Sequence, residues 1–250
     1  MPVVLPPDPP VPTLTPMPPW PPAPALPTGL PWRPDQTVGT GVPIWRTAFD
    51  DPHQAVALWY EFRAAHPSTG WWPLLVSETF WETVEFESTS PPGTGDTTGA
   101  EWLQERLNGG DSPLLSQLTR GDRPPSGVVD EAEVLLAFAE ECTEIVLVPA
   151  AVGWLVPETL NWEGAVNHDF GGHEHTLVLR RWAGYFGAEL FGQTLDEVVL
   201  RVDHPPTGAA AELAAFEAVA YCEDAVFQGS DTLDRLIPMI ESPVWRFWWD

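Results

Sequence analysis

The stretch "NHDFGGHEH" (167–175) carries the side chains that could most readily do chemistry. His168, Asp169, His173 and His175 supply imidazole and carboxylate groups, which are common ligands of zinc and iron. Their spacing does not match the His-Glu-x-x-His pattern of a zinc-binding helix. The neighbouring pair of glycines instead favours a polar loop that leads into a helix. Two interpretations follow, a metal or carboxylate site around His168–His175 and a loop that binds no metal.

The chain has two cysteines, Cys142 and Cys222. They are far apart in the sequence, which is typical of a reducing compartment and gives no zinc spacing. Cys222 is followed by Glu223 and Asp224, and nearby carboxylates raise the pKa of a thiol and blunt its nucleophilicity. We therefore expect small buried residues rather than a catalytic thiol. The sequence also has no G-x-S-x-G, P-loop or G-x-G-x-x-G motif.

The chain is strongly acidic. It has 11 arginines, no lysines and 36 acidic residues, which gives a net charge of −25. Phosphate backbones and anionic membrane surfaces repel such a chain, so we expect neither nucleic acid nor membrane as a partner. A basic protein partner fits the charge, and the alternative is that the charge serves solubility alone. No apolar run of about 18 residues and no signal peptide are present, which predicts a cytoplasmic protein.

The chain divides by composition into three parts. Residues 1–41 are predicted to be a proline-rich disordered tail, since 15 of the 30 prolines lie in residues 1–34 and proline lacks a backbone donor. This tail is either passive or a PxxP ligand for an aromatic groove. Residues 42–140 are predicted to be an N-terminal α/β region that packs on the main domain, residues 141–250.

The N-terminal α/β region has clear start and stop signals. "VPIWRTAF" reads as a strand, Asp51 and Pro52 then begin a helix, and "WWPLLVS" reads as the next strand. Shorter helices are predicted at Glu101–Leu107, Ser112–Leu118 and Asp130–Glu140.

The main domain shows the order β-α-β-β-α-β. Short apolar or alternating runs at 144–150, 188–193 and 197–203 predict strands, and the last strand is the terminal heptad "VWRFWWD". Helical spacing marks 175–186, and a second helix begins after Thr207. The order predicts an α+β protein with a ferredoxin-like antiparallel sheet and its helices on one face.

The heptad is predicted to be an interior strand with two different faces, because strand side chains alternate. Trp245, Phe247 and Trp249 should pack beneath the helices. The opposite face is the candidate binding surface, since arginine and tryptophan dominate interface hot spots. The alternative is that its charges pair with one another or that residues 42–140 cover it. Its candidate binding residues are Glu189, Arg201, Arg246, Trp248 and Asp250.

Four ordered motifs carry a family resemblance: "LRRWAGYFGAEL", "LRVDHPP", "AYCEDAVFQG" and the terminal "FWWD". Together they resemble a bacterial family common in actinobacteria, domain of unknown function 4253, over about residues 145–250. "LWYEFRAAHPSTGWWPLL" (58–75) resembles the segment that precedes this domain. The resemblance implies the domain and no activity, and "HDFGGHEH" is not among its motifs.

Three hypotheses of function remain open. The first is a non-catalytic intracellular protein-binding module for a basic partner, in a narrower form an immunity-type inhibitor of a toxin. The second is an enzyme with a metal or carboxylate site near His168–His175. The third is a structural module of a larger assembly with the tail as tether. No cofactor is predicted, and the sequence gives no oligomeric state.

Overall fold

A computed structural model describes residues 3–10, 21–27, 29–35, 41–84, 97–109, 113–169 and 171–250. The strands are β1 (Arg33–Asp35), β2 (Ile44–Ala48), β3 (Trp71–Val76), β4 (Glu144–Pro149), β5 (Ala188–Gln193), β6 (Glu197–Val202) and β7 (Val244–Trp248). The α-helices are α1 (Pro52–Thr69), α2 (Gly99–Asn108), α3 (Leu114–Gln117), α4 (Glu131–Glu141), α5 (Val156–Leu160), α6 (Gly172–Phe186), α7 (Ala209–Tyr221) and α8 (Leu233–Ile240). Short 3₁₀ turns lie at 78–82, 153–155 and 166–168, and a π-helical turn lies at 225–230.

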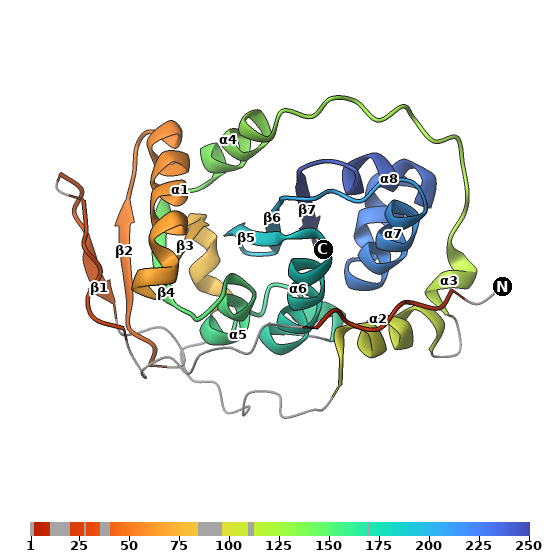
Figure 1. Ribbon diagram of the computed structural model, residues 1–250, viewed down its shortest axis with the longest axis horizontal. Coiled ribbons are helices and arrows are strands. Elements are labelled where there is room, and N and C mark those ends of the chain that lie inside the picture. The colour runs from red at the N-terminus through yellow and green to blue at the C-terminus, as the bar shows by residue number, and fades with distance from the viewer. Residues whose placement is uncertain are drawn as a thin grey trace.

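The described strands form one seven-stranded sheet in the order β1-β2-β4-β3-β5-β6-β7 (Figure 1). Neighbouring strands are antiparallel except β3 and β5, which are parallel. Strands from both halves of the sequence therefore share one sheet, with β3 inserted between β4 and β5.

The ferredoxin-like arrangement predicted for residues 141–250 is wrong, although the mixed helix and strand content is as expected. The predicted elements occur in the predicted order along the chain, but β4 lies between β2 and β3 and pairs with none of the described strands of residues 141–250. The cause lies in β3, whose six residues are all buried. A strand that is buried throughout needs a neighbour on each edge and a cover on each face, so it occupies the centre of the sheet.

The junction of β3 and β5 is irregular for an identifiable reason. Pro73 has no N–H to donate, and backbone pairing between the two strands is limited to Leu75 with Gly192 and Val76 with Gln193. The indole N–H of Trp72 donates instead to the carbonyl of Leu190 at 3.0 Å. The β5–β6 register shifts between Leu190 and Gly192, which leaves Phe191 as a bulge.

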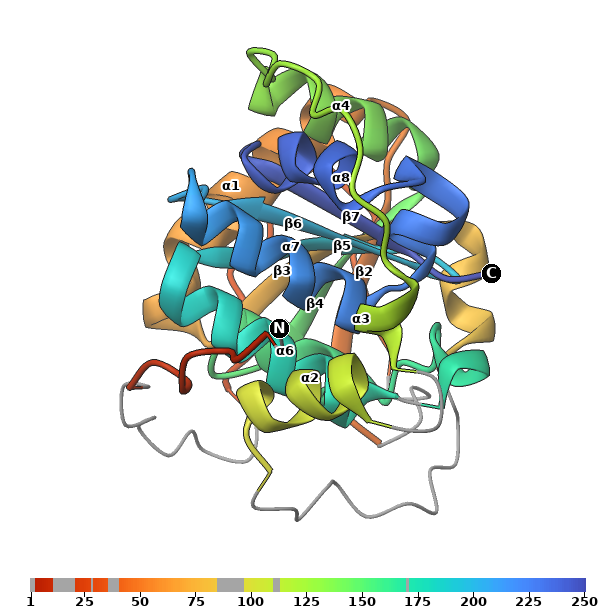
Figure 2. The same cartoon turned by 90° about the vertical axis from the view of Figure 1, so that its right-hand side faces the viewer.

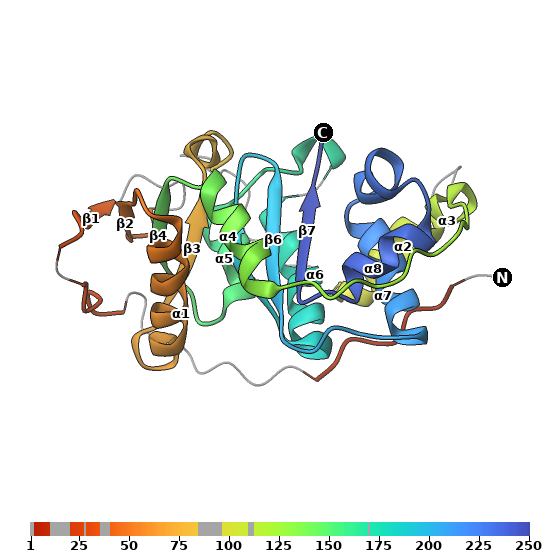
Figure 3. The same ribbon diagram turned by 90° about the horizontal axis from the view of Figure 1, so that it is seen from above.

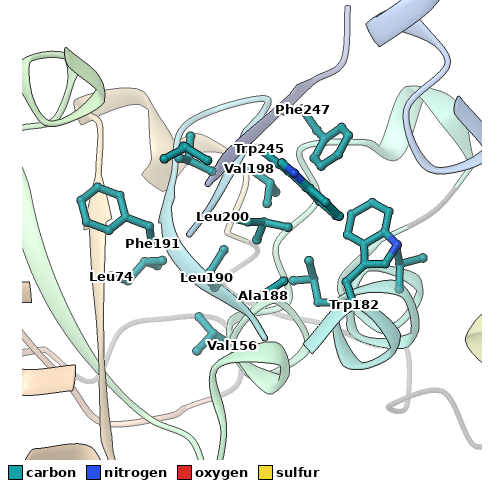
Figure 4. Close-up of a cluster of buried hydrophobic side chains, with 14 of the residues drawn as sticks. Leu74, Val156, Trp182, Ala188, Leu190, Phe191, Val198, Leu200, Trp245 and Phe247 are labelled. Atoms are coloured by element: carbon teal, nitrogen blue, oxygen red, sulfur yellow. The ribbon is translucent and has the colours of Figure 1, made fainter. Parts of the chain in front are cut away.

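Helices cover the two faces of the sheet. On one face α1 and α4 lie together (Figure 3), and their Trp59 and Phe138 pack on Phe191 with ring centroids 4.9 and 6.1 Å apart. On the other face Trp182 of α6 stacks on Phe247 at 5.2 Å. Figure 4 shows Trp182, Trp245 and Phe247 together, with Phe191 on the far side of the strands.

The predicted faces of the terminal heptad are confirmed, but β7 is an edge strand of the described sheet rather than an interior one. Trp245 and Phe247 are fully buried and Trp249 is 2% exposed. β7 pairs with β6 over five residues, with Trp245 opposite Leu200 and Phe247 opposite Val198.

The observed helix ends lie close to the predicted ones in the N-terminal region and agree less well near the C-terminus. Asp51 caps α1, with Pro52 as its first residue and the left-handed Gly70 after its last. α7 begins at Ala209 with Gly208 as its N-cap, one residue later than the start predicted after Thr207, and it buries the face with Ala211, Ala214 and Ala218. α8 was not predicted.

The N-terminal segment differs from the expected disordered tail in its described residues. Residues 3–10 have extended backbone and run along α2 and α6 (Figures 1 and 2), and Leu5 is 8% exposed. Residues 33–35 form β1. Residues 1–2, 11–20, 28 and 36–40 of the predicted tail lie outside the described residues.

Candidate functional site

The candidate binding face of the sheet holds a chain of ion pairs around Arg201. Glu189 of β5 lies directly opposite Arg201 of β6, and their side chains are 3.4 Å apart. Arg201 also donates to Glu131 at 2.9 Å and to Asp203 at 3.0 Å. Glu189 accepts from Nε of Arg63 in α1 at 2.8 Å. These contacts join the sheet face to both covering helices.

Arg246 makes an equivalent set of contacts on β7. Its Nε donates to Oε1 of Glu197 at 2.6 Å, and its Nη2 lies 3.2 Å from Glu141. Burial raises the pKa of Glu197, and the hydrogen bond from Arg246 opposes that rise. Glu131 and Glu141 are the first and last residues of α4. Arg201 and Arg246 therefore hold the two ends of this helix against the sheet.

Trp248 and Asp250 lie at the end of β7, where carboxylates gather. Trp248 is half-buried and Asp250 is exposed, and the backbone N–H of Asp250 donates to Asp224 at 3.0 Å. The backbone N–H of Trp249 donates to the carbonyl of Asp196. We call four acidic residues near the last residues of β7 the acidic rim. Glu141 pairs with Arg246, the carbonyl of Asp196 accepts from Trp249, Glu223 follows Cys222, whose Sγ donates to the carbonyl of Trp248, and Asp250 follows Trp249.

The histidines of the 167–175 stretch do not converge. His168 lies between Glu223 and Asp224, 3.4 and 3.3 Å from their carboxylates. His173 lies 3.4 Å from Glu158. His175 points inward, where Nδ1 is hydrogen-bonded to the Tyr221 hydroxyl at 2.6 Å. In the ranges that the structure describes, no three His, Cys, Asp or Glu side chains form a set that could hold a metal ion.

His175 belongs to an aromatic cluster rather than to a cleft. Its ring packs on Trp162 at 4.7 Å, on Trp249 at 5.3 Å and on Tyr221 at 5.5 Å. Complete burial lowers its pKa to about 3, so the imidazole is neutral at physiological pH. Burial also raises the pKa of Tyr221 well above its usual value. This pair is therefore part of the core.

Both cysteines are free and buried, as the sequence predicts. Burial raises the pKa of Cys142 strongly and that of Cys222 to about 12. Sγ of Cys222 donates to the carbonyl of Trp248 at 2.9 Å. Neither thiol is set up as a nucleophile, because the thiolate is the reactive form.

Sequence reasoning missed the carboxylates that complete the sheet-face network, because they lie on a different element, α4. It also missed a buried pair, in which Arg181 of α6 donates to Glu217 of α7 at 2.7 Å. The sequence does contain a signal for this pair, since both residues lie on helix faces that are otherwise apolar. Arg181 immediately precedes Trp182, and Glu217 lies one turn before Tyr221. The indole N–H of Trp182 donates to the same carboxylate at 2.8 Å.

Residues 144–250 match a family described as a domain of unknown function (DUF4253). This finding supports the resemblance that the four sequence motifs indicated. No curated protein and no solved structure matches the chain. The comparisons thus assign no specific function. Within the described ranges, no helix combines the length and the apolar character that a membrane crossing requires.

Proposed function

We propose that the chain is a non-catalytic protein-binding module for a basic partner. Its C-terminal region matches a family of unknown function, so the proposal is based on its own residues. The partner docks at the acidic rim, with Trp248 as the aromatic contact. Arg246 and Asp250 lie two residues before and after Trp248 in the sequence. Glu189 and Arg201 lie further along the sheet, where Arg201 pairs with Glu189 and Glu131.

The main support for the proposal is that the arginine side chains are already bound by carboxylates or carbonyls of the chain itself. Ten of them form ion pairs with carboxylates of the chain itself, and Arg106 donates to the carbonyls of Ala220 and His168. The ten are Arg33, Arg46, Arg63, Arg120, Arg123, Arg180, Arg181, Arg201, Arg235 and Arg246. The surplus of 36 − 11 = 25 acidic residues therefore has no arginine to balance it. A complementary positive surface on a partner would be attracted to that surplus.

The acidic rim is the part of the acidic surface best suited to a specific contact, although one of its members, Glu141, is paired with Arg246. Isolated surface carboxylates give little affinity, because water and salt screen them. Here they lie near the end of the strand that carries the half-buried Trp248, and tryptophan contributes large contact area at interface hot spots. The ring is positioned by β7, because Trp248 pairs with Glu197 and its carbonyl accepts from Cys222.

In the narrower form of the proposal the basic partner is a toxin, and the chain is its immunity-type inhibitor. Two free buried thiols support a cytoplasmic setting, since such cysteines persist where the environment is reducing. The actinobacterial setting that the sequence motifs imply indicates which host to examine.

The test is capture of basic proteins from an actinobacterial host lysate on the immobilised full chain, with identification by mass spectrometry. We expect one basic protein retained near stoichiometry at about 0.05 M salt and released at about 0.3 M, because screening weakens charge pairing. Asp250→Arg reverses an exposed charge and should abolish retention, as should Trp248→Ala.

Glu61→Arg is the matched control, because Glu61 is an exposed acid on α1 far along the chain from the rim. This variant should retain the same protein as the unmodified chain. Equal retention by Asp250→Arg and Glu61→Arg would contradict the proposed site, and an empty column at low salt would contradict the proposed function. Relief of the captured protein's toxicity on co-expression tests the narrower form.

A further inference from the structure

The surface between α2 and α6 binds the N-terminal segment through contacts typical of proline-rich ligands. We call residues 3–9 the strap and the surface beneath it the proline groove, formed by the first turn of α2 with Gln104, Arg181, Gly184 and Tyr185. Arg181 donates to the carbonyl of Pro6 at 2.9 Å, and the Tyr185 hydroxyl donates to the carbonyl of Pro7. Proline residues leave their carbonyls free, and an aromatic side chain beside them is a recurring feature of polyproline recognition.

Gln104 recognises the backbone at the start of the strap. Its Oε1 accepts from the N–H of Leu5 at 2.9 Å, and its Nε2 donates to the carbonyl of Val3 at 2.9 Å. The Leu5 side chain is 8% exposed. One amide therefore fixes the register in which the leucine enters its apolar position.

Asp8 contacts both the N-terminus of α2 and the arginine side chains of α6. Its carboxylate accepts from the N–H groups of Gly99 and Ala100 at 2.8 and 2.9 Å, at the start of α2. It also lies 2.8 Å from Arg181 and 3.7 Å from Arg180. The site selects an acidic residue here, because a neutral side chain would remove one of the two carboxylates that pair with Arg181 and the carboxylate that lies near Arg180.

Contacts within the folded chain position the side chains that form the proline groove. Glu217 holds Arg181 from α7, so the guanidinium is positioned before the strap arrives. Arg181 also lies over the Tyr185 ring, 4.9 Å from its centroid. A Cβ at Gly184 would lie 2.4 Å from Pro9, so this glycine permits the close approach of the ligand.

We propose that the proline groove is a recognition site for an acidic proline-rich segment of the form Leu-Pro-Pro-Asp-Pro, and that residues 5–9 are its exchangeable intramolecular ligand. A partner protein that presents the same chemistry binds here once the strap leaves. The tether gives the strap an effective concentration on the order of millimolar, so it masks the site from weaker ligands. The acidic rim is not involved, and either proposal stands without the other.

The test uses a fluorescein-labelled peptide with the sequence of residues 3–10 and the full chain carrying Leu5→Glu and Asp8→Arg, which releases the strap. We expect saturable binding by fluorescence anisotropy to this variant, and binding at least about tenfold weaker to the unmodified chain. An Asp-to-Asn peptide should bind at least about tenfold more weakly, because it loses a charge-assisted contact. Tyr185→Phe in the released chain should weaken binding, whereas Tyr60→Phe on the opposite side of the sheet should not.

A second experiment avoids dependence on the folding of the released variant. A protease site placed within residues 11–20 allows the strap to be cut after the chain has folded. We expect the cut strap to dissociate on dilution, and the labelled peptide to bind the emptied groove and be displaced by unlabelled peptide. Absence of saturable peptide binding to either released chain would overturn the proposal.

Discussion

At the scale of single residues, His175 gives the clearest link between burial and stability. Its pKa is about 3 in the folded chain, against an ordinary value of 6.5, because burial disfavours the charged ring. The unfolded chain therefore takes up a proton below pH 6.5 that the folded chain refuses. Stability should be unaffected by this group above pH 6.5 and should fall by about 1.4 kcal/mol per pH unit between 6.5 and 3.

Urea unfolding of the full chain and of His175→Gln, measured from pH 7.5 to pH 4.5, checks this prediction. The unmodified chain should lose stability more steeply below pH 6.5 than the variant, because the variant has no imidazole to protonate. His204→Gln changes an exposed histidine and should follow the unmodified chain. Parallel curves for the chain and for His175→Gln would show that His175 is protonated in the folded state.

Gln193 is a second residue whose environment makes a definite prediction. It is fully buried at the end of β5, and among the described residues neither its Oε1 nor its Nε2 has a hydrogen-bond partner. An unsatisfied buried polar group costs about 1–3 kcal/mol, so Gln193→Met should raise the free energy of unfolding by about 1 kcal/mol. Gln104→Met is the matched control, because both amide atoms of Gln104 are hydrogen-bonded to the strap and their loss should destabilise the chain. Denaturant unfolding of the two variants should give changes of opposite sign.

Residues with a local role were predictable from the sequence, and residues with a distant partner were not. Asp51 caps its helix as expected, Asp130 caps α4 where the predicted helix begins, and Gly187 ends α6 in the left-handed conformation, because these roles depend on the adjacent few residues. Arg181 depends on Glu217 and on Asp8, which is 173 positions away. Nothing in the local pattern fixes such a pairing.

At the scale of elements, α4 is held to the sheet at both ends, and the two ends should differ in strength. The Arg201–Glu131 pair is 21% and 29% exposed, whereas the Arg246–Glu141 pair is 34% and 52% exposed. Solvent screens the second pair more, so its coupling should be smaller. Double-mutant cycles with Arg201→Met and Glu131→Gln should give about 0.5–1 kcal/mol, and the corresponding cycle at Arg246 and Glu141 should give less. Equal coupling at the two ends would contradict this ranking.

Most strands and helices were predictable as separate elements, but their order in the sheet was not. The alternating pattern of the terminal heptad gave the two faces of β7 correctly, since alternation is a property of one strand. The position of β3 depends on pairing with strands about 70 and 115 residues further along, which is a question of tertiary packing. For the candidate site the same limit applies, because the heptad showed Arg246 and Trp248 on one face but not the helix that covers it.

At the scale of the whole molecule, the family match and the folding unit do not coincide. The matched residues 144–250 contain β4 without β2 and β3, its two neighbours in the sheet. They also lack α1 and α4, so Phe191 would lose Trp59 and Phe138. We predict that residues 144–250 alone show no cooperative unfolding by circular dichroism and bind a hydrophobic dye. Residues 41–250 keep every strand except β1 and should unfold cooperatively. Cooperative unfolding of the shorter fragment would contradict this prediction, because β4 would then have to pair with a different strand in the absence of β2 and β3.

The net charge of −25 makes a prediction about the folded chain as a whole. The arginine pairs act over a few ångströms, whereas the surplus carboxylates repel one another over a distance set by the Debye length. That length falls from about 30 Å at 0.01 M salt to about 8 Å at 0.15 M, so salt removes the repulsion before it weakens the close pairs. The melting temperature should therefore rise over this range, measured by calorimetry with sodium chloride and again with choline chloride to separate screening from specific ion binding. A fall in both salts would mean that the ion pairs, rather than the surplus, dominate. The same increase in salt should weaken capture of a basic partner at the acidic rim, so stability and binding are expected to change in opposite directions.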